Sequence, residues 1–203
     1  MSSVALDPPA TAGRIIEVLH PGPVPVAEPA PASPEGGLLI HPACTADAAA
    51  IAAIYNDTLP PPALRGTLRA LGLAEVQGWM LLHRGSGRPL WVARSGPHTV
   101  GWLSFLGYFD RPGCEATAEL SVYVAPAWQG RGIGRQLVDR AVQRAPACGY
   151  RRLLAQIWSD NHASLGLFAR AGFVLWGRLP GAVRIGERRC DMVLLGHELA
   201  ERP

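Results

Sequence analysis

The sequence predicts one α/β domain, in which helices cover the faces of a mixed sheet, preceded by an irregular extension. From residue 38 onward, apolar residues alternate between strand-like and helix-like spacing. A chain of 203 residues with 48% hydrophobic and 17% charged residues has enough apolar material for a single core. Earlier residues differ, since eight of the 19 prolines lie in residues 1–37. We therefore expect a largely irregular extension over 1–37 and a folded domain over 38–203.

The expected order of elements is strand, helices, three strands, helix, strand, helix and two strands. Thr45 is the expected N-cap of the first helix, Pro60 ends it, Gly72 breaks the second helix, and Pro146 frays the end of the third. The spacing predicts strands at 38–40, 90–93, 99–105, 116–124, 153–158, 173–178 and 191–199, and later helices at 64–82, 133–148 and 161–171.

Composition argues against several functions. A net charge of +3 is small for sequence-independent nucleic-acid binding. No apolar run reaches the roughly 18–20 residues of a membrane span, and the first residues lack a secretory signal pattern, so we expect a cytoplasmic protein. Four scattered cysteines and six scattered histidines predict neither a disulfide framework nor a metal site. The lack of lysine excludes Schiff-base chemistry and lysine phosphate loops.

The most informative segment is a glycine-rich turn between a predicted strand and a predicted helix. Residues 129–135 read Gln-Gly-Arg-Gly-Ile-Gly-Arg. Glycines let a ligand approach the backbone closely, and successive N–H groups at a helix start bind anions. The two arginines add bidentate donors, so pyrophosphate is the ligand that this turn favours. A tight strand-to-helix turn without a ligand is the alternative interpretation.

Three segments resemble the GNAT superfamily of N-acetyltransferases. Residues 129–134 resemble its Q/R-x-x-G-x-G/A acetyl-CoA motif, residues 120–126 its pantetheine-binding strand, and residues 161–173 its N-x-x-[SA]-x-x-[LF]-Y-x-x-x-G-F segment. Within the superfamily, residues 117–124 are most similar to the phosphinothricin and methionine-sulfone acetyltransferases. The resemblance implies a GNAT fold, with a mixed, mostly antiparallel sheet of six to seven strands, about four flanking helices, and a splay at the acetyl-CoA site.

The resemblance also implies an activity. The expected reaction transfers an acetyl group from acetyl-CoA to the amine of a small molecule, an amino acid or analogue, by direct attack in a ternary complex. A protein N-terminal or side-chain N-acetyltransferase is one alternative. A non-catalytic acyl-CoA-binding sensor is the other, because Phe168 stands where many members have a tyrosine or histidine. The expected partner is a small amine and not a nucleic acid or a membrane, and the resemblance alone implies a homodimer.

An amine substrate with a pKa of roughly 10 is protonated at neutral pH and needs a general base. Glu119 is the candidate, because strand alternation places it on one face with Ser121 and Tyr123, and the family has an acidic residue here. A solvated structural glutamate is the alternative interpretation of this residue. Asp110 and Glu115 are the other candidates for the base.

The resemblance implies the remaining site residues. It assigns the oxyanion donor to a backbone N–H near Tyr123 or Val124. Phe168 donates no proton, so Ser164, Tyr123 or a water is the candidate donor to the leaving thiolate. The implied acetyl-CoA contacts are Val122, Tyr123, Val124, Gln129, Gly130, Arg131, Gly132, Ile133, Gly134, Arg135, Asn161, Ser164 and Phe168.

The acceptor side of the site is less specified. Trp102 and Trp158 are candidates for lining the acceptor pocket, with ordinary core packing as the alternative. Arg65 and Arg111 are candidates for binding an acceptor carboxylate, with solvated arginines as the alternative.

Overall fold

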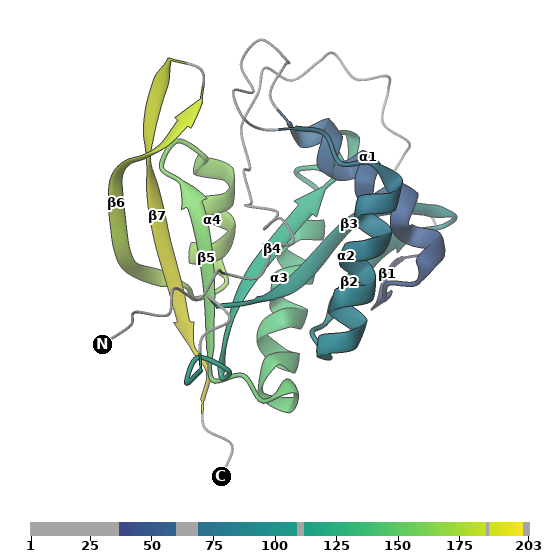
Figure 1. Ribbon diagram of the computed structural model, residues 1–203, viewed down its shortest axis with the longest axis horizontal. Coiled ribbons are helices and arrows are strands. Elements are labelled where there is room, and N and C mark those ends of the chain that lie inside the picture. The colour runs from purple at the N-terminus through teal and green to yellow at the C-terminus, as the bar shows by residue number, and fades with distance from the viewer. Residues whose placement is uncertain (1–36, 60–68, 109–111, 186, 201–203) are drawn as a thin grey trace, which may run out of the picture.

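The computed structural model describes residues 37–59, 69–108, 112–185 and 187–200. Its centre is one seven-stranded sheet with the strand order β1-β2-β3-β4-β5-β7-β6 (Figure 1). All neighbouring strands are antiparallel except β4 and β5, which are parallel, so the expected mixed sheet is confirmed. The strands are β1 (Leu38–Pro42), β2 (Leu90–Ser95), β3 (His98–Gly107), β4 (Thr117–Val124), β5 (Arg152–Trp158), β6 (Val174–Ile185) and β7 (Arg188–Glu198).

Helices flank this sheet in the order that the sequence predicts. The described residues form the α-helices α1 (Ala48–Thr58), α2 (Leu73–Ser86), α3 (Ile133–Arg144) and α4 (His162–Arg170). Short 3-10 turns adjoin them, namely η1 (Thr45–Asp47), η3 (Pro126–Trp128) and η4 (Ala145–Cys148). None of the helices in the described part of the chain is long and apolar enough to cross a bilayer.

The helix boundaries confirm two sequence predictions and correct a third. Pro146 has the expected effect, because α3 ends at Arg144 and η4 follows it. Gly72 is the N-cap of α2. The prediction that Thr45 caps the first helix is wrong, because Thr45 begins η1 and Asp47 precedes α1. The Pro60 stop, the first part of the expected 64–82 helix and all of the extension except Gly37 lie outside the described residues.

The last two strands are longer than predicted. They pair with each other as an antiparallel hairpin from Val174↔Gly196 to Ile185↔Arg188, with register shifts on β6. Cross-strand pairing extends both strands through segments of mixed polarity, where local alternation gives no strand signal. Among the described residues β6 pairs in the sheet with β7 alone, so it is an edge strand there.

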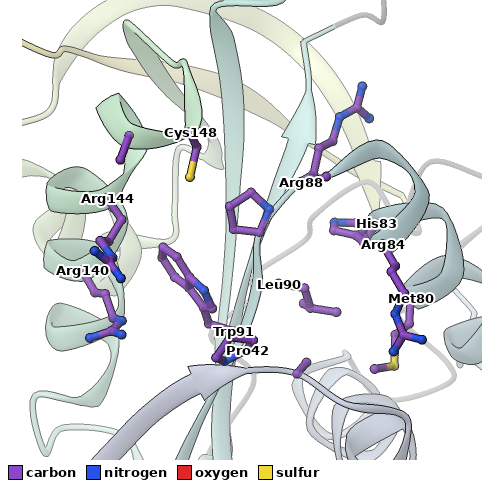
Figure 2. Close-up of a pocket in the computed structure, with 14 residues that line it drawn as sticks. Pro42, Met80, His83, Arg84, Arg88, Leu90, Trp91, Arg140, Arg144 and Cys148 are labelled. Carbon is purple, nitrogen blue, oxygen red and sulfur yellow. The ribbon is translucent and has the colours of Figure 1, made fainter.

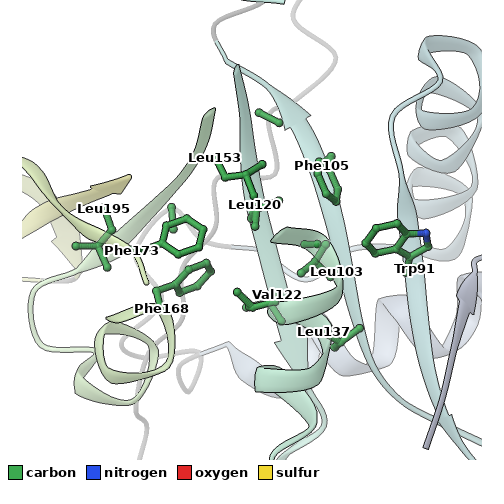
Figure 3. Close-up of a cluster of buried hydrophobic side chains, with 14 of the residues drawn as sticks. Trp91, Leu103, Phe105, Leu120, Val122, Leu137, Leu153, Phe168, Phe173 and Leu195 are labelled. Atoms are coloured by element: carbon green, nitrogen blue, oxygen red, sulfur yellow. The ribbon is translucent and has the colours of Figure 1, made fainter. Parts of the chain in front are cut away.

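Two apolar layers cover the sheet. One contains α3 and α4 side chains, including Leu137 and Phe168, against the central strands (Figure 3). The other contains α1 and α2 side chains against Val92, Trp102 and Tyr123. Strand alternation divides β4 between them, because Leu120 and Val122 lie in the first layer and Tyr123 in the second. The face that the sequence predicts for Tyr123 is therefore confirmed.

A buried carboxylate joins the first turn of the domain to two strands. The Asp47 side chain is fully buried and accepts hydrogen bonds from Arg94 at 2.5 Å, the Cys44 N–H at 2.9 Å and Thr99 at 3.3 Å. Burial raises the pKa of Asp47, but the hydrogen bonds from Arg94 and Cys44 outweigh it and hold the pKa below its ordinary value of 3.8. Asp47 therefore fixes α1 to β2 and β3 as an anion.

Replacing Asp47 should destabilise the domain. We expect Asp47→Ala to lower the free energy of unfolding by about 2–3 kcal/mol, because it leaves Arg94 and the Cys44 N–H without their acceptor. A carboxylate with a lowered folded-state pKa contributes stability above its unfolded pKa of about 3.9 and loses it as pH falls through the folded value. The difference between wild type and Asp47→Asn in urea titrations should therefore shrink below about pH 4.

Asp139→Ala is the matched control, because its carboxylate pairs with Arg135 at the exposed surface of α3. Its effect on unfolding should stay under about 1 kcal/mol. Equal effects of the two alanine variants would contradict the structural role of Asp47.

Candidate active site

The sheet opens between β4 and β5. These parallel strands pair only at Thr117↔Arg152, Ala118↔Leu153 and Glu119↔Leu154, although both strands continue beyond this point. Figure 1 shows them separating toward their C-terminal ends. A gap in a parallel pair exposes main-chain groups of the inner strands to a ligand. The expected splay of the sheet is therefore present.

Glu119 is the last residue of β4 that pairs with β5. Its side chain is buried and accepts a hydrogen bond from Gln156 Nε2 at 2.9 Å. Gln156 lies on β5, two residues beyond the paired Leu154, where β5 no longer pairs with β4. A partnered, buried carboxylate at the start of the opening differs from the solvated glutamate that was the alternative.

Aromatic rings occupy the sheet face on the same side as Glu119. Tyr123 stacks on Trp102 with ring centroids 4.3 Å apart and lies 5.5 Å from Tyr55. Trp79 meets Trp102 edge-on at 5.4 Å. Because Tyr55 comes from α1 and Trp79 from α2, these two helices build the aromatic wall beside β4. Trp102 is 1% exposed, so it packs within this wall.

The glycine-rich turn has the backbone shape that an anion site needs. Gly130 and Gly132 have φ angles of +73° and +78°, and an added Cβ at either position would meet no atom within 4 Å. Gly132 is the N-cap of α3, so the first N–H groups of this helix open onto the same space. Gln129 Nε2 donates to the Val124 carbonyl at 3.1 Å and ties the turn to the end of β4.

The arginines and the third glycine of the turn have specific contacts. Arg131 lies 5.0 Å from the centroid of the Trp128 ring. Arg135 donates through Nε to both carboxylate oxygens of Asp139 at 2.7 Å. A Cβ on Gly134 would lie 3.2 Å from the Leu167 side chain. Gly134 therefore permits close packing of α3 on α4.

The start of α4 has a buried polar cap. Asn161 Oδ1 accepts a hydrogen bond from the Ser164 N–H at 3.1 Å, so Asn161 is the N-cap of α4. Ser164 is buried as well. Phe168 is 1% exposed and packs edge-on against Phe173 with centroids 4.9 Å apart (Figure 3). The ring belongs to the core between α4 and the sheet, and its contact with acetyl-CoA stays a prediction.

The residues for which the resemblance implies acetyl-CoA contacts on β4 differ in how far they are buried. Val122 and Tyr123 are almost fully buried on opposite faces of β4, and Val124 is half-buried at the end of the strand. Ile133 is buried in the layer of α3. A ligand in the opening can therefore reach these residues through the main chain more readily than through their side chains.

Of the remaining candidate residues, the structure describes Glu115 and Trp158. Glu115 is exposed, and a hydrogen bond from the Gly113 N–H at 3.0 Å lowers its pKa, which makes it a weaker base. Trp158 is 1% exposed in a small cluster with Cys190 and Met192. Asp110, Arg65 and Arg111 lie outside the described residues.

Sequence reasoning missed two polar side chains that shape the site. Gln156 is the partner of Glu119, and its signal was a lone polar residue inside the apolar run 153–158. Asn56 clamps the main chain of Leu71, donating to its carbonyl at 3.0 Å and accepting from its N–H at 2.8 Å. This pair of bonds ties the end of α1 to the segment before α2. In the part of the chain that the structure describes, no three metal-ligating side chains gather.

The geometry fits a ligand with a pyrophosphate and a long thioester arm. The open space at Gly130 and Gly132, beside the N-terminus of α3, suits a phosphate group. The opening between β4 and β5 begins at Glu119 and continues to the turn. An arm that ran along this opening would bring its reactive end next to the buried carboxylate.

Comparison with known proteins agrees with this geometry. The model of the acetyltransferase (GNAT) family matches residues 48–173. The L-amino acid N-acyltransferase MnaT of Escherichia coli is 33% identical over 157 residues, which are 77% of this chain and 91% of that protein. The L-methionine sulfoximine/L-methionine sulfone acetyltransferase of Salmonella typhimurium has the same identity and coverage.

A solved structure with acetyl-CoA extends the comparison to three dimensions. The protein yncA of Salmonella typhimurium, determined with its cofactor acetyl-CoA, superimposes with a TM-score of 0.75 at 30% identity, covering 81% of this chain and 95% of that one. The family match spans β4, the glycine-rich turn, β5 and α4, so it includes both strands of the opening. The chain therefore belongs to the acetyltransferase (GNAT) family, and acetyl-CoA is its co-substrate.

Proposed function

We propose that the enzyme acetylates the amino group of a free amino acid or a close analogue, by direct attack of the amine on acetyl-CoA in a ternary complex. The observation that carries the proposal is a buried, hydrogen-bonded Glu119 at the point where β4 and β5 separate. The names of the relatives, which act on L-amino acids and methionine derivatives, support the acceptor class. The aromatic wall from α1 and α2 suits a compact apolar side chain.

In this proposal Glu119 is the general base. Its carboxylate accepts a proton from the acceptor ammonium, directly or through water, and the Gln156 amide holds the carboxylate in place. The amine nitrogen then bonds to the acetyl carbon while the carbon–sulfur bond breaks. The sulfur keeps that electron pair and takes up the proton that the new amide nitrogen releases.

Main-chain donors complete the proposed chemistry. A backbone N–H of β4 near Tyr123 or Val124 stabilises the negative charge that develops on the thioester oxygen. A CoA thiol is acidic enough to leave with hydrogen-bond help, so the buried Phe168 ring does not block the reaction. Ser164 and Tyr123 are the proposed donors to the sulfur, and both belong to the elements beside the opening.

We propose that two copies assemble through β6. This edge strand exposes large apolar side chains that water does not favour, namely Val174 at 59%, Leu175 at 65%, Trp176 at 40% and Leu179 at 55%. An edge strand also presents main-chain donors and acceptors to a second copy of itself under two-fold symmetry.

The cytoplasm is the proposed location, because all four cysteines are unpaired, as in a reducing compartment.

Turnover with a panel of amines tests the proposed acceptor. The full chain, given acetyl-CoA and followed by release of the CoA thiol, should acetylate methionine sulfone, methionine sulfoximine or another free L-amino acid. Peptides with free N-termini should react much more slowly. Faster reaction with peptides would identify the protein acetyltransferase alternative, and binding of acetyl-CoA without any turnover would identify the sensor.

Removing the basicity of Glu119 should slow the chemical step. Glu119→Gln keeps the shape of the side chain, and general-base catalysis contributes about 10²–10⁴-fold, so kcat/KM near neutral pH should fall within that range. The loss should shrink as pH rises, because more amine arrives deprotonated. Acetyl-CoA affinity by calorimetry should stay close to that of wild type. Glu115→Gln is the control, and wild-type rates in Glu119→Gln across the pH range would remove Glu119 from the mechanism.

The two glycines of the turn should respond differently to valine. Gly132→Val fills the open space before α3 at a positive φ, so acetyl-CoA affinity should fall at least tenfold, about 1.4 kcal/mol. Gly134→Val should instead lower the melting temperature, because its Cβ meets Leu167 at 3.2 Å. Gly96→Val controls for backbone strain, since Gly96 also has a positive φ and open space, in the turn after β2. Unchanged affinity in folded Gly132→Val would refute this phosphate site.

The β6 surface predicts a concentration-dependent dimer. Light scattering after size exclusion should give twice the chain mass of 21.6 kDa for wild type. The double variant Leu175→Asp/Leu179→Asp should give the mass of one chain, because the charges cannot be buried against a second copy. Leu39→Asp is the control, because this residue is 67% exposed on β1 at the opposite edge of the sheet. A monomeric wild type would overturn the proposal.

A further inference from the structure

The aromatic wall comes from two separate helices, so its shape depends on how those helices are joined. Tyr55 lies in the last turn of α1, and Trp79 lies in the middle of α2. Figure 1 shows the two helices side by side on one face of the sheet, where their side chains share one apolar layer with Trp102 and Tyr123. A shift of α2 relative to α1 therefore moves one ring of the wall relative to the other.

Asn56, the residue after Tyr55, holds the segment that leads into α2. Its Nδ2 atom donates to the Leu71 carbonyl at 3.0 Å, and its Oδ1 atom accepts from the Leu71 N–H at 2.8 Å. The side-chain amide thus pairs with both main-chain groups of one residue, as two hydrogen-bonded residues of an antiparallel sheet do. A carboxylate of the same size lacks the donor, and alanine lacks both groups. Asparagine is therefore the residue that this pairing requires.

A side chain of α2 holds the same segment from the other side. Glu75 accepts a hydrogen bond from the Gly72 N–H at 2.9 Å through Oε2, and one from Arg69 at 2.5 Å through Oε1. Leu71 and Gly72 lie between the two helices, and side chains from both helices bind their main chain. We call Asn56, Leu71, Gly72 and Glu75 the helix junction. Hydrogen bonds at this junction fix the direction in which α2 begins.

The other end of α2 is packed less completely. A cavity of about 630 Å³ borders the C-terminal half of this helix, and Met80, His83 and Arg84 are among the residues that line it (Figure 2). Side chains do not fill the space there, and a gap removes the van der Waals contacts that would hold a helix in one position. The placement of α2 therefore depends more strongly on the helix junction at its N-terminal end.

We propose that Asn56 is a positioning residue for the acceptor: by holding Leu71 it sets Trp79 relative to Tyr55, and so determines which amino-acid side chains fit against the aromatic wall. This inference rests on the proposed function, because it takes the wall as the binding surface of the acceptor. A well-defined apolar pocket separates side chains that differ by one methylene by about 10–200-fold. A wall whose helices can shift discriminates less, since its supporting residues no longer hold the pocket to one shape.

Steady-state kinetics of the full chain test this role, with saturating acetyl-CoA and two acceptors, methionine sulfone and the smaller alanine. In Asn56→Ala the KM for methionine sulfone should rise by about fivefold or more while kcat stays within about twofold, because the lost binding is the same in the ground state and the transition state. The preference for methionine sulfone over alanine in kcat/KM should fall by about threefold or more. The Kd of acetyl-CoA by calorimetry should not change.

Thr58→Val is the matched control in the same turn of α1. It removes the hydrogen bond from Thr58 Oγ1 to the Tyr55 carbonyl at 2.7 Å and leaves both bonds to Leu71 in place. Its KM for methionine sulfone and its preference between the two acceptors should equal those of wild type. Glu75→Ala loosens the helix junction at an exposed position, so it tests the same role if Asn56→Ala does not fold. Its KM should change in the same direction as that of Asn56→Ala.

Two outcomes separate this inference from the proposed function. A lower melting temperature with wild-type KM and wild-type preference in Asn56→Ala and Glu75→Ala would show that the helix junction serves stability alone, and would overturn the inference while the proposed function stands. Absence of turnover of any free amino acid by wild type would overturn the proposed acceptor class, and this inference with it.

Discussion

The short parallel pairing of β4 with β5 is the constraint on which the rest of this enzyme depends. Hydrogen bonding between the two strands stops at Glu119↔Leu154, and both strands continue apart. If the pairing ran on to Val124, the main chain of β4 would be used within the sheet, and a thioester arm would have no edge to lie against. The opening therefore exists because β4 and β5 are not paired by hydrogen bonds beyond Glu119 and Leu154.

Apolar packing supports this open sheet from one side. Val122 and Ile157 on the diverging strands, Leu137 on α3 and Phe168 on α4 belong to one continuous core. Since α3 and α4 pack closely, with Gly134 against Leu167, their apolar side chains cover this face of the sheet. Phe168 is part of that cover. The Phe168 ring cannot donate a proton. Because it is buried in the core, it fills this position without leaving a cavity.

The other face of the sheet is the proposed place of the acceptor. Glu119 and Tyr123 share a face of β4 because alternate residues of a strand point the same way. The helices α1 and α2 cover that face with Tyr55 and Trp79, and the Asn56 clamp on Leu71 fixes the approach to α2. The proposed base Glu119 and the Tyr123 ring thus lie on one face of β4, while α3, whose N-terminus is the proposed phosphate site, packs on the opposite face.

The sequence by itself determined the features that depend on neighbouring residues. It predicted the order of strands and helices, the turn at Gly130 and Gly132, and the shared face of Glu119 and Tyr123. Each of these follows from a periodicity of two or 3.6 residues or from glycine at positive φ. These features depend on residues that are close together in the sequence, so a short segment is enough to predict them.

Only the tertiary structure decided which distant segments meet. It placed β7 between β5 and β6, ended the β4–β5 ladder at Glu119, and set Gln156 against a carboxylate 37 residues earlier in the chain. Strand pairing and helix packing are chosen by the total burial of the whole chain, so no local pattern contains them.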